Sequence, residues 1–451
     1  MPGLWFKRAL LPEGWADDVR VEIADGRIAS VTAGAEPGGA ERFNGIAIPG
    51  LGNAHSHAFQ RGMAGLAERR GTHHDTFWTW REAMYRFALT MSPDDVEAIA
   101  AQLYVEMLEA GFTRVGEFHY LHHDRDGRPY ANIAEMASRI AAAAEASGIG
   151  LTLLPVFYAH SDFGAAPPLT EQRRFISNLD LYARLFEASR VPLLNLPGSI
   201  LGLAPHSLRA ATTQQIEAIL SLAPEGRIHM HIAEQEKEVR DCLAWSTARP
   251  VALLLDNAEV GRRWCLVHAT HMDDDEAFRL AGSGATVSLC PVTEANLGDG
   301  IFDAPRFVKR RGRTAIGTDS NILIGVADEL RQLEYSQRLR DRSRNVMAED
   351  GGSTGRALFE AALAGGAAAL GSGAARIEAG ASADIVTLDP DHRALAGKSG
   401  DALLDAWIFA AGNEAIDCVF VRGEQVVSGR RHYRRETIRK RFDQAMVRLA
   451  V

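Results

Sequence analysis

Between residues 47 and 372, short apolar segments alternate with amphipathic or alanine-rich segments. The apolar segments have the length and composition of buried strands: 45–57, 111–120, 148–158, 200–207, 226–234, 263–271, 284–291 and 313–320. Segments between them, such as 93–111 and 133–148, have helical spacing. This repeated strand–helix alternation predicts an α/β fold, a parallel (β/α)8 barrel of the TIM type, over residues 47–372.

The two ends of the chain carry β patterns of a different style. Residues 18–34 are typical of a hairpin that turns at Asp25-Gly26, and 383–390 and 416–430 supply further short strands. We therefore expect a small β-sandwich domain built from both chain termini, residues 1–46 and 373–430, followed by a C-terminal helix over 431–451.

Residues 357–375 are rich in alanine and glycine, and they have two interpretations. They could form a flexible linker, or a small-residue helix packed tightly against the barrel. Their larger apolar residues keep helical spacing, which favours the helix.

Charge and composition exclude several classes of function. The formal net charge of -9 offers no basic surface for nucleic acid. No stretch approaches the ~20 apolar residues that cross a bilayer, so we expect no membrane partner and a cytoplasmic location. The cysteines form no CxxC pair and are expected to be buried free thiols: Cys242, Cys265, Cys290 and Cys418.

Polar side chains fall at the C-terminal ends of the predicted barrel strands, where such barrels place their chemistry. They are His55, His57, His119, His206, His231, His268 and Asp319. His55 and His57 are two residues apart on one strand, so both imidazoles face the same side and suit zinc or iron. Each residue alone could be a core histidine or a helix cap. Their common position predicts a metal site.

Several segments resemble the amidohydrolase superfamily over essentially the whole chain: PGLGNAHSHAFQ, HIAEQ, LVHATH, IGTDS and ARIEAGASADIVTLD. The resemblance implies that the metal is held by His55, His57, His231 and Asp319. It also implies that His268 lies near the nucleophilic water or the substrate.

Binuclear members of the superfamily bridge two metals with a carboxylated lysine on the fourth strand. This chain has no lysine between Lys7 and Lys237. The resemblance therefore favours the mononuclear deaminase branch, with one divalent metal per chain, Zn²⁺ ahead of Fe²⁺.

Three residues are expected to carry the catalytic steps. Asp319 accepts a proton from the attacking water, Glu234 carries it to the departing nitrogen, and His268 orients the water or stabilises the tetrahedral intermediate. Glu234 also has a plainer interpretation, as a surface residue of the charged run 234–238.

Polar residues on the predicted rim suit a substrate with carboxylates, because guanidinium groups bind carboxylates bidentately. We expect substrate binding by Gln60, Arg81, Tyr120, His206 and Arg209. Alternatively, Arg81 pairs with a surface acid and Arg209 begins a solvated helix face. The rim segments offer these polar anchors rather than the aromatic walls that heterocycles need.

The segments AHSHAFQRGMAG, WTWREAM, EFHYLHH and LAPHSLRA resemble the formimidoylglutamate deiminase family within the superfamily. That resemblance implies a small dianionic substrate, N-formimidoyl-L-glutamate, hydrolysed to N-formyl-L-glutamate and ammonia by a protein that is often a homodimer. Two alternatives stay open. One is a deaminase of a purine, pterin or cytosine-like ring. The other is a non-catalytic amidohydrolase-like assembly protein, which the intact ligand set and Glu234 disfavour.

Overall fold

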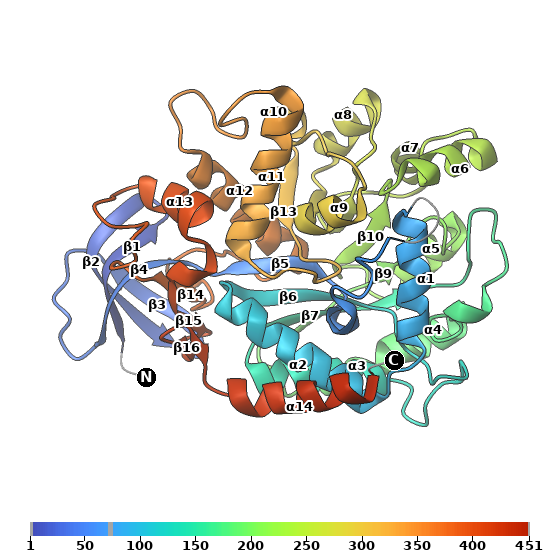
Figure 1. Ribbon diagram of the computed structural model, residues 1–451, viewed down its shortest axis with the longest axis horizontal. Helices are drawn as coiled ribbons and strands as arrows, with labels where there is room; N and C mark the ends of the chain where they lie inside the picture. Colours follow the sequence, from blue (N-terminus) through green and yellow to red (C-terminus); the bar gives the residue numbers. More distant parts are fainter. Residues whose placement is uncertain (1–2, 71–74, 450–451) are drawn as a thin grey trace.

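The computed structural model describes residues 3–70 and 75–449, and its centre is a parallel β-barrel surrounded by helices (Figure 1). One group of parallel strands joins β5 (Leu51–Ser56), β6 (Phe112–His119), β7 (Gly150–Phe157), β8 (Ile200–Leu201) and β9 (Ala204–Pro205). A second joins β10 (Ile228–Ile232), β11 (Trp264–His268), β12 (Thr286–Leu289) and β13 (Arg313–Ile316). The predicted (β/α)8 barrel is thus confirmed.

Backbone hydrogen bonds join the two groups of strands and close the barrel. Leu203 N–H donates to the Arg227 carbonyl at 2.7 Å, which links the β8–β9 region to β10. On the other side, Asp319 N–H donates to the His55 carbonyl at 3.0 Å, and His57 N–H donates to the Asp319 carbonyl at 3.0 Å. The second closure therefore ties two predicted metal-site segments directly together.

Two predicted strands are divided in the structure. The segment 45–57 was expected to be one barrel strand, but it forms β4 (Glu41–Pro49) in the terminal sheet and then β5 in the barrel. The chain changes sheets at Gly50, where a Cβ would lie 2.3 Å from the Thr113 methyl group. The segment 200–207 was also expected as one strand, but it forms β8 and β9 around Gly202-Leu203.

The terminal strands form one mixed sheet in the order β17-β16-β15-β14-β4-β1-β2-β3. Its other members are β1 (Leu4–Leu11), β2 (Gly14–Ala24), β3 (Arg27–Thr32), β14 (Ile385–Leu388), β15 (Ile416–Val421), β16 (Glu424–Ser428) and β17 (Arg431–His432). The β3 end meets the chain just before β14, since Ile28 N–H donates to the Ala381 carbonyl. The folded sheet encloses its own apolar core, in which the rings of Phe6, Phe43 and Phe420 pack together.

Helices cover the barrel, connect strands of the barrel or of the terminal sheet, and follow the last strand (Figure 1). They are α1 (Phe77–Ala88), α2 (Pro93–Glu109), α3 (Glu135–Ser147), α4 (Leu179–Ala188), α5 (Thr213–Leu220), α6 (Glu236–Ser246), α7 (Pro250–Asn257), α8 (Asp274–Ser283), α9 (Pro291–Leu297), α10 (Ala304–Lys309), α11 (Val326–Asp341), α12 (Thr354–Leu370), α13 (Ala402–Ala406) and α14 (Arg435–Leu449). The last helix, α14, packs along α2, and its Arg448 pairs with Asp95 at 2.6 Å.

All four cysteines are buried and unpaired, as predicted. Among the helices in the described part of the chain, none combines the length and hydrophobicity that a bilayer-spanning segment requires.

Helix α12 lies directly on the barrel, so the small-residue segment is the predicted packed helix and the linker interpretation is wrong. Its glycines make this close approach possible. A Cβ on Gly365 would lie only 1.8 Å from the Thr314 carbonyl oxygen of β13, and a Cβ on Gly52 of β5 would meet Leu370 at 2.5 Å.

We expect Gly365→Ala to destabilise the protein by about 3 kcal/mol or more, because the backbone of β13 has to move away from the added methyl group. Gly282→Ala is the matched control, since Gly282 lies in α8 with nothing within 4 Å of its missing Cβ. Alanine there should be neutral or stabilise the helix by up to about 1 kcal/mol. Urea unfolding midpoints of the two variants measure the difference. Equal midpoints would contradict tight packing at Gly365.

Candidate metal centre and substrate cavity

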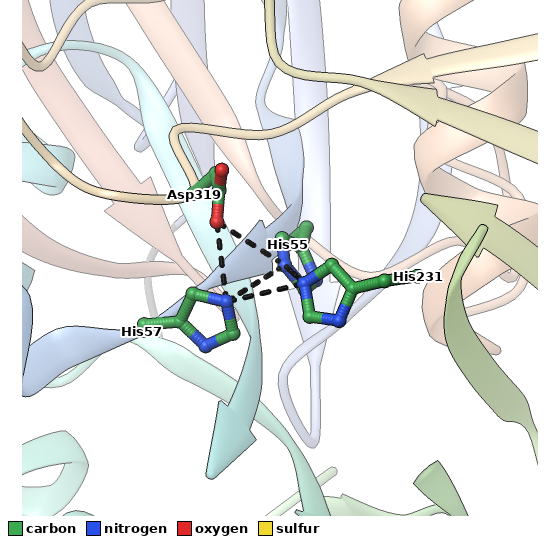
Figure 2. A group of neighbouring side chains, drawn as sticks. All are labelled: His55, His57, His231 and Asp319. Atoms are coloured by element: carbon green, nitrogen blue, oxygen red, sulfur yellow. Dashed lines mark hydrogen bonds and ion pairs between the residues drawn. The ribbon is translucent and has the colours of Figure 1, made fainter. Parts of the chain in front are cut away.

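The side chains of His55, His57, His231 and Asp319 converge at the C-terminal mouth of the barrel (Figure 2). All four are buried. The three Nε2 atoms lie 3.0 to 3.3 Å from one another, and Asp319 Oδ1 lies 3.1 Å from His57 Nε2 and 3.4 Å from His55 Nε2. The structure therefore brings together the four residues that were expected to hold the metal.

These separations fit a tetrahedral metal site. Zinc bonds of about 2.0–2.1 Å to nitrogen and oxygen place tetrahedral ligand atoms about 3.3 Å apart, close to the spacings seen here. Neutral imidazoles cannot all donate hydrogen bonds to one another around one point. A cation at the centre of the four atoms satisfies all of their lone pairs at once.

Neighbouring backbone carbonyls orient the imidazoles. Phe118 O lies 2.9 Å from His57 Nδ1, and His206 O lies 3.2 Å from His231 Nδ1. A proton on each Nδ1 leaves Nε2 with a free lone pair, which is the tautomer that a metal ligand needs.

The electrostatics agree with this ligand set. Burial lowers the pKa of His55 to about 3, so its imidazole is neutral at physiological pH. Burial opposes ionisation of Asp319, but the neighbouring imidazoles of His55 and His57 outweigh burial and hold the pKa of this carboxyl well below its ordinary value. The site thus offers a neutral imidazole at His55 and a carboxylate at Asp319, next to the Nε2 atoms of His57 and His231.

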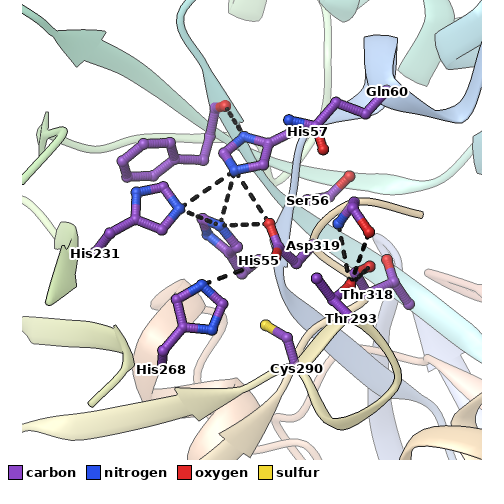
Figure 3. Close-up of polar contacts among 12 residues, drawn as sticks. His55, Ser56, His57, Gln60, His231, His268, Cys290, Thr293, Thr318 and Asp319 are labelled. Carbon is purple, nitrogen blue, oxygen red and sulfur yellow. Dashed lines mark hydrogen bonds and ion pairs between the residues drawn. The ribbon is translucent and has the colours of Figure 1, made fainter. Parts of the chain in front are cut away.

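His268 lies beside the four residues, with Nε2 3.8 Å from Asp319 Oδ2 (Figure 3). The same Nε2 lies 3.7 Å from Glu234 Oε1, and Nδ1 lies 3.2 Å from Glu294 Oε1. Burial disfavours the imidazolium, but these carboxylates outweigh burial and raise the pKa of His268 to about 10. A cation therefore links the candidate metal site to Glu234.

Glu234 is buried at the barrel mouth, so its interpretation as a surface residue is wrong. Burial raises the pKa of its carboxyl to about 7. A carboxyl group with this pKa exchanges protons readily near neutral pH, as general acid–base catalysis requires.

Three of the four side chains, those of His57, His231 and Asp319, line a cavity at the barrel mouth. All five predicted substrate-binding residues line it: Gln60, Arg81, Tyr120, His206 and Arg209. Arg209 is buried, so a solvated helix face is excluded for it. The guanidinium groups of Arg81 and Arg209 both lie over the ring of Trp78, at 4.4 and 5.8 Å from its centroid.

The expectation of polar anchors in place of aromatic walls was wrong, because the cavity has both. Aromatic side chains from α1 and the loops after β7 also line it: Phe77, Trp80, Tyr85, Tyr158 and Phe175. Two of these residues carry a signal in the sequence. Tyr85 lies one helical turn after Arg81, and Tyr158 directly follows a strand, as Tyr120 does.

The family model described as "Amidohydrolase family" matches residues 46–426. The chain belongs to the amidohydrolase family. Residues 4–45 of this amidohydrolase also match the model described as "Formimidoylglutamate deiminase HutF, N-terminal domain". The predicted superfamily is thereby confirmed. The match of residues 4–45 is to the N-terminal domain of one enzyme of that superfamily, formimidoylglutamate deiminase.

Individual relatives agree with this family. The chain is 52% identical over 449 residues to formimidoylglutamate deiminase from Pseudomonas aeruginosa, covering 99% of both chains. A solved amidohydrolase from Brucella melitensis is 54% identical, with a TM-score of 0.95 over 100% of both chains. A 5-methylthioadenosine/S-adenosylhomocysteine deaminase from Haloarcula marismortui is 28% identical over 77% of this chain and 74% of its own.

An adenosine deaminase from Xanthomonas campestris, solved with bound zinc, shares the fold at 22% identity. Its TM-score is 0.83 over 99% of this chain and 98% of its own.

Proposed function

We propose that this amidohydrolase hydrolyses N-formimidoyl-L-glutamate to N-formyl-L-glutamate and ammonia, with one Zn²⁺ held by His55, His57, His231 and Asp319. The observation that carries the proposal is the 52% identity to formimidoylglutamate deiminase along the whole chain. The matching N-terminal segment and two arginines in the cavity support it.

A divalent metal held by these ligands supplies Lewis acidity, which makes water nucleophilic near neutral pH. Asp319 then accepts the water proton on Oδ2, because Oδ1 faces His55 and His57. His268 faces the same Oδ2 and Glu234, so its cationic ring orients the nucleophile and stabilises negative charge.

Glu234 completes the proton balance. Addition of water to the amidine carbon forms one C–O bond and breaks the C=N π bond, so the departing nitrogen takes up a proton. The remaining C–N single bond then breaks as the new hydroxyl group loses its proton and becomes the product carbonyl. Ammonia is a far better leaving group than amide anion, so the nitrogen has to gain a proton first. With a pKa near 7, the Glu234 carboxyl can take up the proton released by water and deliver it to this nitrogen.

Arg81 and Arg209 are proposed to hold the substrate carboxylates. We expect Arg209→Ala to retain metal but to lose roughly 2 kcal/mol or more of transition-state binding, because the variant leaves a buried charge unpaired. Steady-state kinetics with the dicarboxylate and with an analogue lacking one carboxylate measure this loss. The analogue should suffer less from whichever arginine variant removes its missing partner. Equal losses for both substrates in both arginine variants would contradict the proposed binding of the carboxylates by Arg81 and Arg209.

The aromatic cavity walls and the similarity to a methylthioadenosine/S-adenosylhomocysteine deaminase support a second candidate, deamination of a heterocyclic base. An ammonia-release assay on zinc-loaded protein decides between the two. The proposed function requires turnover of N-formimidoyl-L-glutamate far above that of adenosine and guanine derivatives. Turnover of the bases alone would overturn it.

A further inference from the structure

A buried amide joins two tyrosines of the cavity wall. Gln172, which is fully buried, ends the short 3₁₀ helix η2 (Thr170–Gln172). Its Nε2 donates to the phenolic oxygen of Tyr85 at 3.1 Å and to that of Tyr158 at 2.9 Å. Both tyrosines are buried and line the cavity. The three residues come from α1, the end of β7 and a loop, so tertiary structure alone brings them together.

The orientation of this amide is fixed by the backbone. Gln172 Oε1 accepts the N–H of Leu169 at 2.9 Å, so the nitrogen has to face the phenols. Both N–H groups of Gln172 are then used, and each phenolic oxygen is an acceptor. Each tyrosine still has its own hydroxyl hydrogen to donate.

Those hydroxyl hydrogens have few acceptors. The two phenols interact with each other, and this contact uses at most one of the two hydrogens. Within residues 3–70 and 75–449, neither hydroxyl group has another hydrogen-bond acceptor in the protein. At least one O–H is therefore left for a ligand in the cavity.

The surroundings of these phenols favour an anionic ligand. The Arg81 guanidinium lies 5.6 Å from the centroid of the Tyr85 ring, and Arg209 acts electrostatically on Tyr158. Burial raises the pKa of Tyr158 well above its ordinary value, so the phenol stays neutral and keeps the hydrogen that it donates. Neutral O–H donors beside guanidinium groups are the partners that a carboxylate binds.

We propose that Tyr85 and Tyr158 donate hydroxyl hydrogen bonds to a substrate carboxylate, and that Gln172 is the positioning residue that turns them toward the cavity. The inference rests on the proposed function, because it assigns two further ligands to the carboxylates of that substrate. It adds a specificity element to the predicted residues Arg81 and Arg209.

The first test is the double variant Tyr85→Phe/Tyr158→Phe. We expect its KM for N-formimidoyl-L-glutamate to rise roughly 10- to 100-fold with little change in kcat, as expected for lost hydrogen bonds to a charged group. Tyr182→Phe is the matched control, because Tyr182 is equally buried but donates to the Pro155 carbonyl away from the cavity. A double variant with the same KM as this control would overturn the proposal.

The second test isolates Gln172. Gln172→Glu keeps the Leu169 contact but accepts the phenol hydrogens and turns them away from the cavity. We expect a raised KM in the wild-type background and a much smaller effect when Tyr85 and Tyr158 are both Phe. An equal effect in both backgrounds would show that the new charge acts directly, and the positioning role would be wrong.

Calorimetric titration of zinc-loaded protein with glutarate separates this inference from the proposed function. Wild-type protein that releases no ammonia from N-formimidoyl-L-glutamate would contradict the function. Weaker glutarate binding by the double variant than by Tyr182→Phe would still support the phenols as carboxylate ligands. Equal binding by the two variants would refute them.

Discussion

Replacing His231 with alanine should reduce tightly bound metal to near zero and leave turnover at background. Its Nε2 lies 3.0 Å from that of His55 and 3.3 Å from that of His57, at the point where the four proposed ligand atoms meet. Without the metal, water keeps a pKa of about 15.7 in place of about 7, and the nucleophile is lost. We expect the same result for alanine at His55, His57 or Asp319. Metal analysis of the purified variants, together with ammonia release, measures both effects.

His229→Ala is the matched control for this prediction. His229 lies on the same strand, is fully buried, and places Nε2 2.9 Å from the Ala369 carbonyl, outside the four-residue group. Its loss should cost stability, but the folded variant should keep its metal. Full metal content and turnover in any two of the four ligand variants would show that the proposed coordination is wrong.

The ends of the barrel strands were the most predictable part of the structure. Parallel strands in one barrel present their C-terminal residues to the same mouth. The strand pattern alone therefore placed His55, His231 and Asp319 together, although 264 positions separate the first from the last. The resemblance of short segments to known amidohydrolases then distinguished proposed ligands from His268, which the pattern could not do.

Residues on loops and helix faces were less predictable. Gln172 lies in the short helix η2, and its contact with Tyr85 depends on how α1 packs over the cavity. The spacing of apolar and polar residues along the sequence does not predict such a contact. Glu294 was missed for a similar reason, since its approach to His268 depends on the packing of α9 against the barrel.

The division of the segment 45–57 into two strands also could not be predicted from the sequence pattern. A run of apolar residues shows that a strand is buried, but it does not show which sheet the strand joins. The change of sheet occurs at Pro49-Gly50, and only the close approach of Thr113 to Gly50 explains why glycine is required there.

Glu234→Gln should retain metal and lose roughly 10²- to 10⁴-fold in turnover, the range usual for general acid–base groups. The amide has nearly the same shape as the carboxyl but cannot carry the transferred proton. Glu234 lies outside the four-residue group, so metal content should match that of the wild type. Ammonia release at saturating substrate, with metal analysis of the same sample, separates a lost proton transfer from a lost metal.

Glu236→Gln is the matched control, because it makes the same chemical change in the same charged run at an exposed position. It should leave turnover unchanged. His268 lies between the two carboxylates that could carry the proton, because its Nε2 faces both Glu234 and Asp319. If Glu234→Gln kept near-normal turnover, the proton would have to pass from water to the departing nitrogen through Asp319 alone. The raised pKa of Glu234 would then reflect burial without a role in proton transfer.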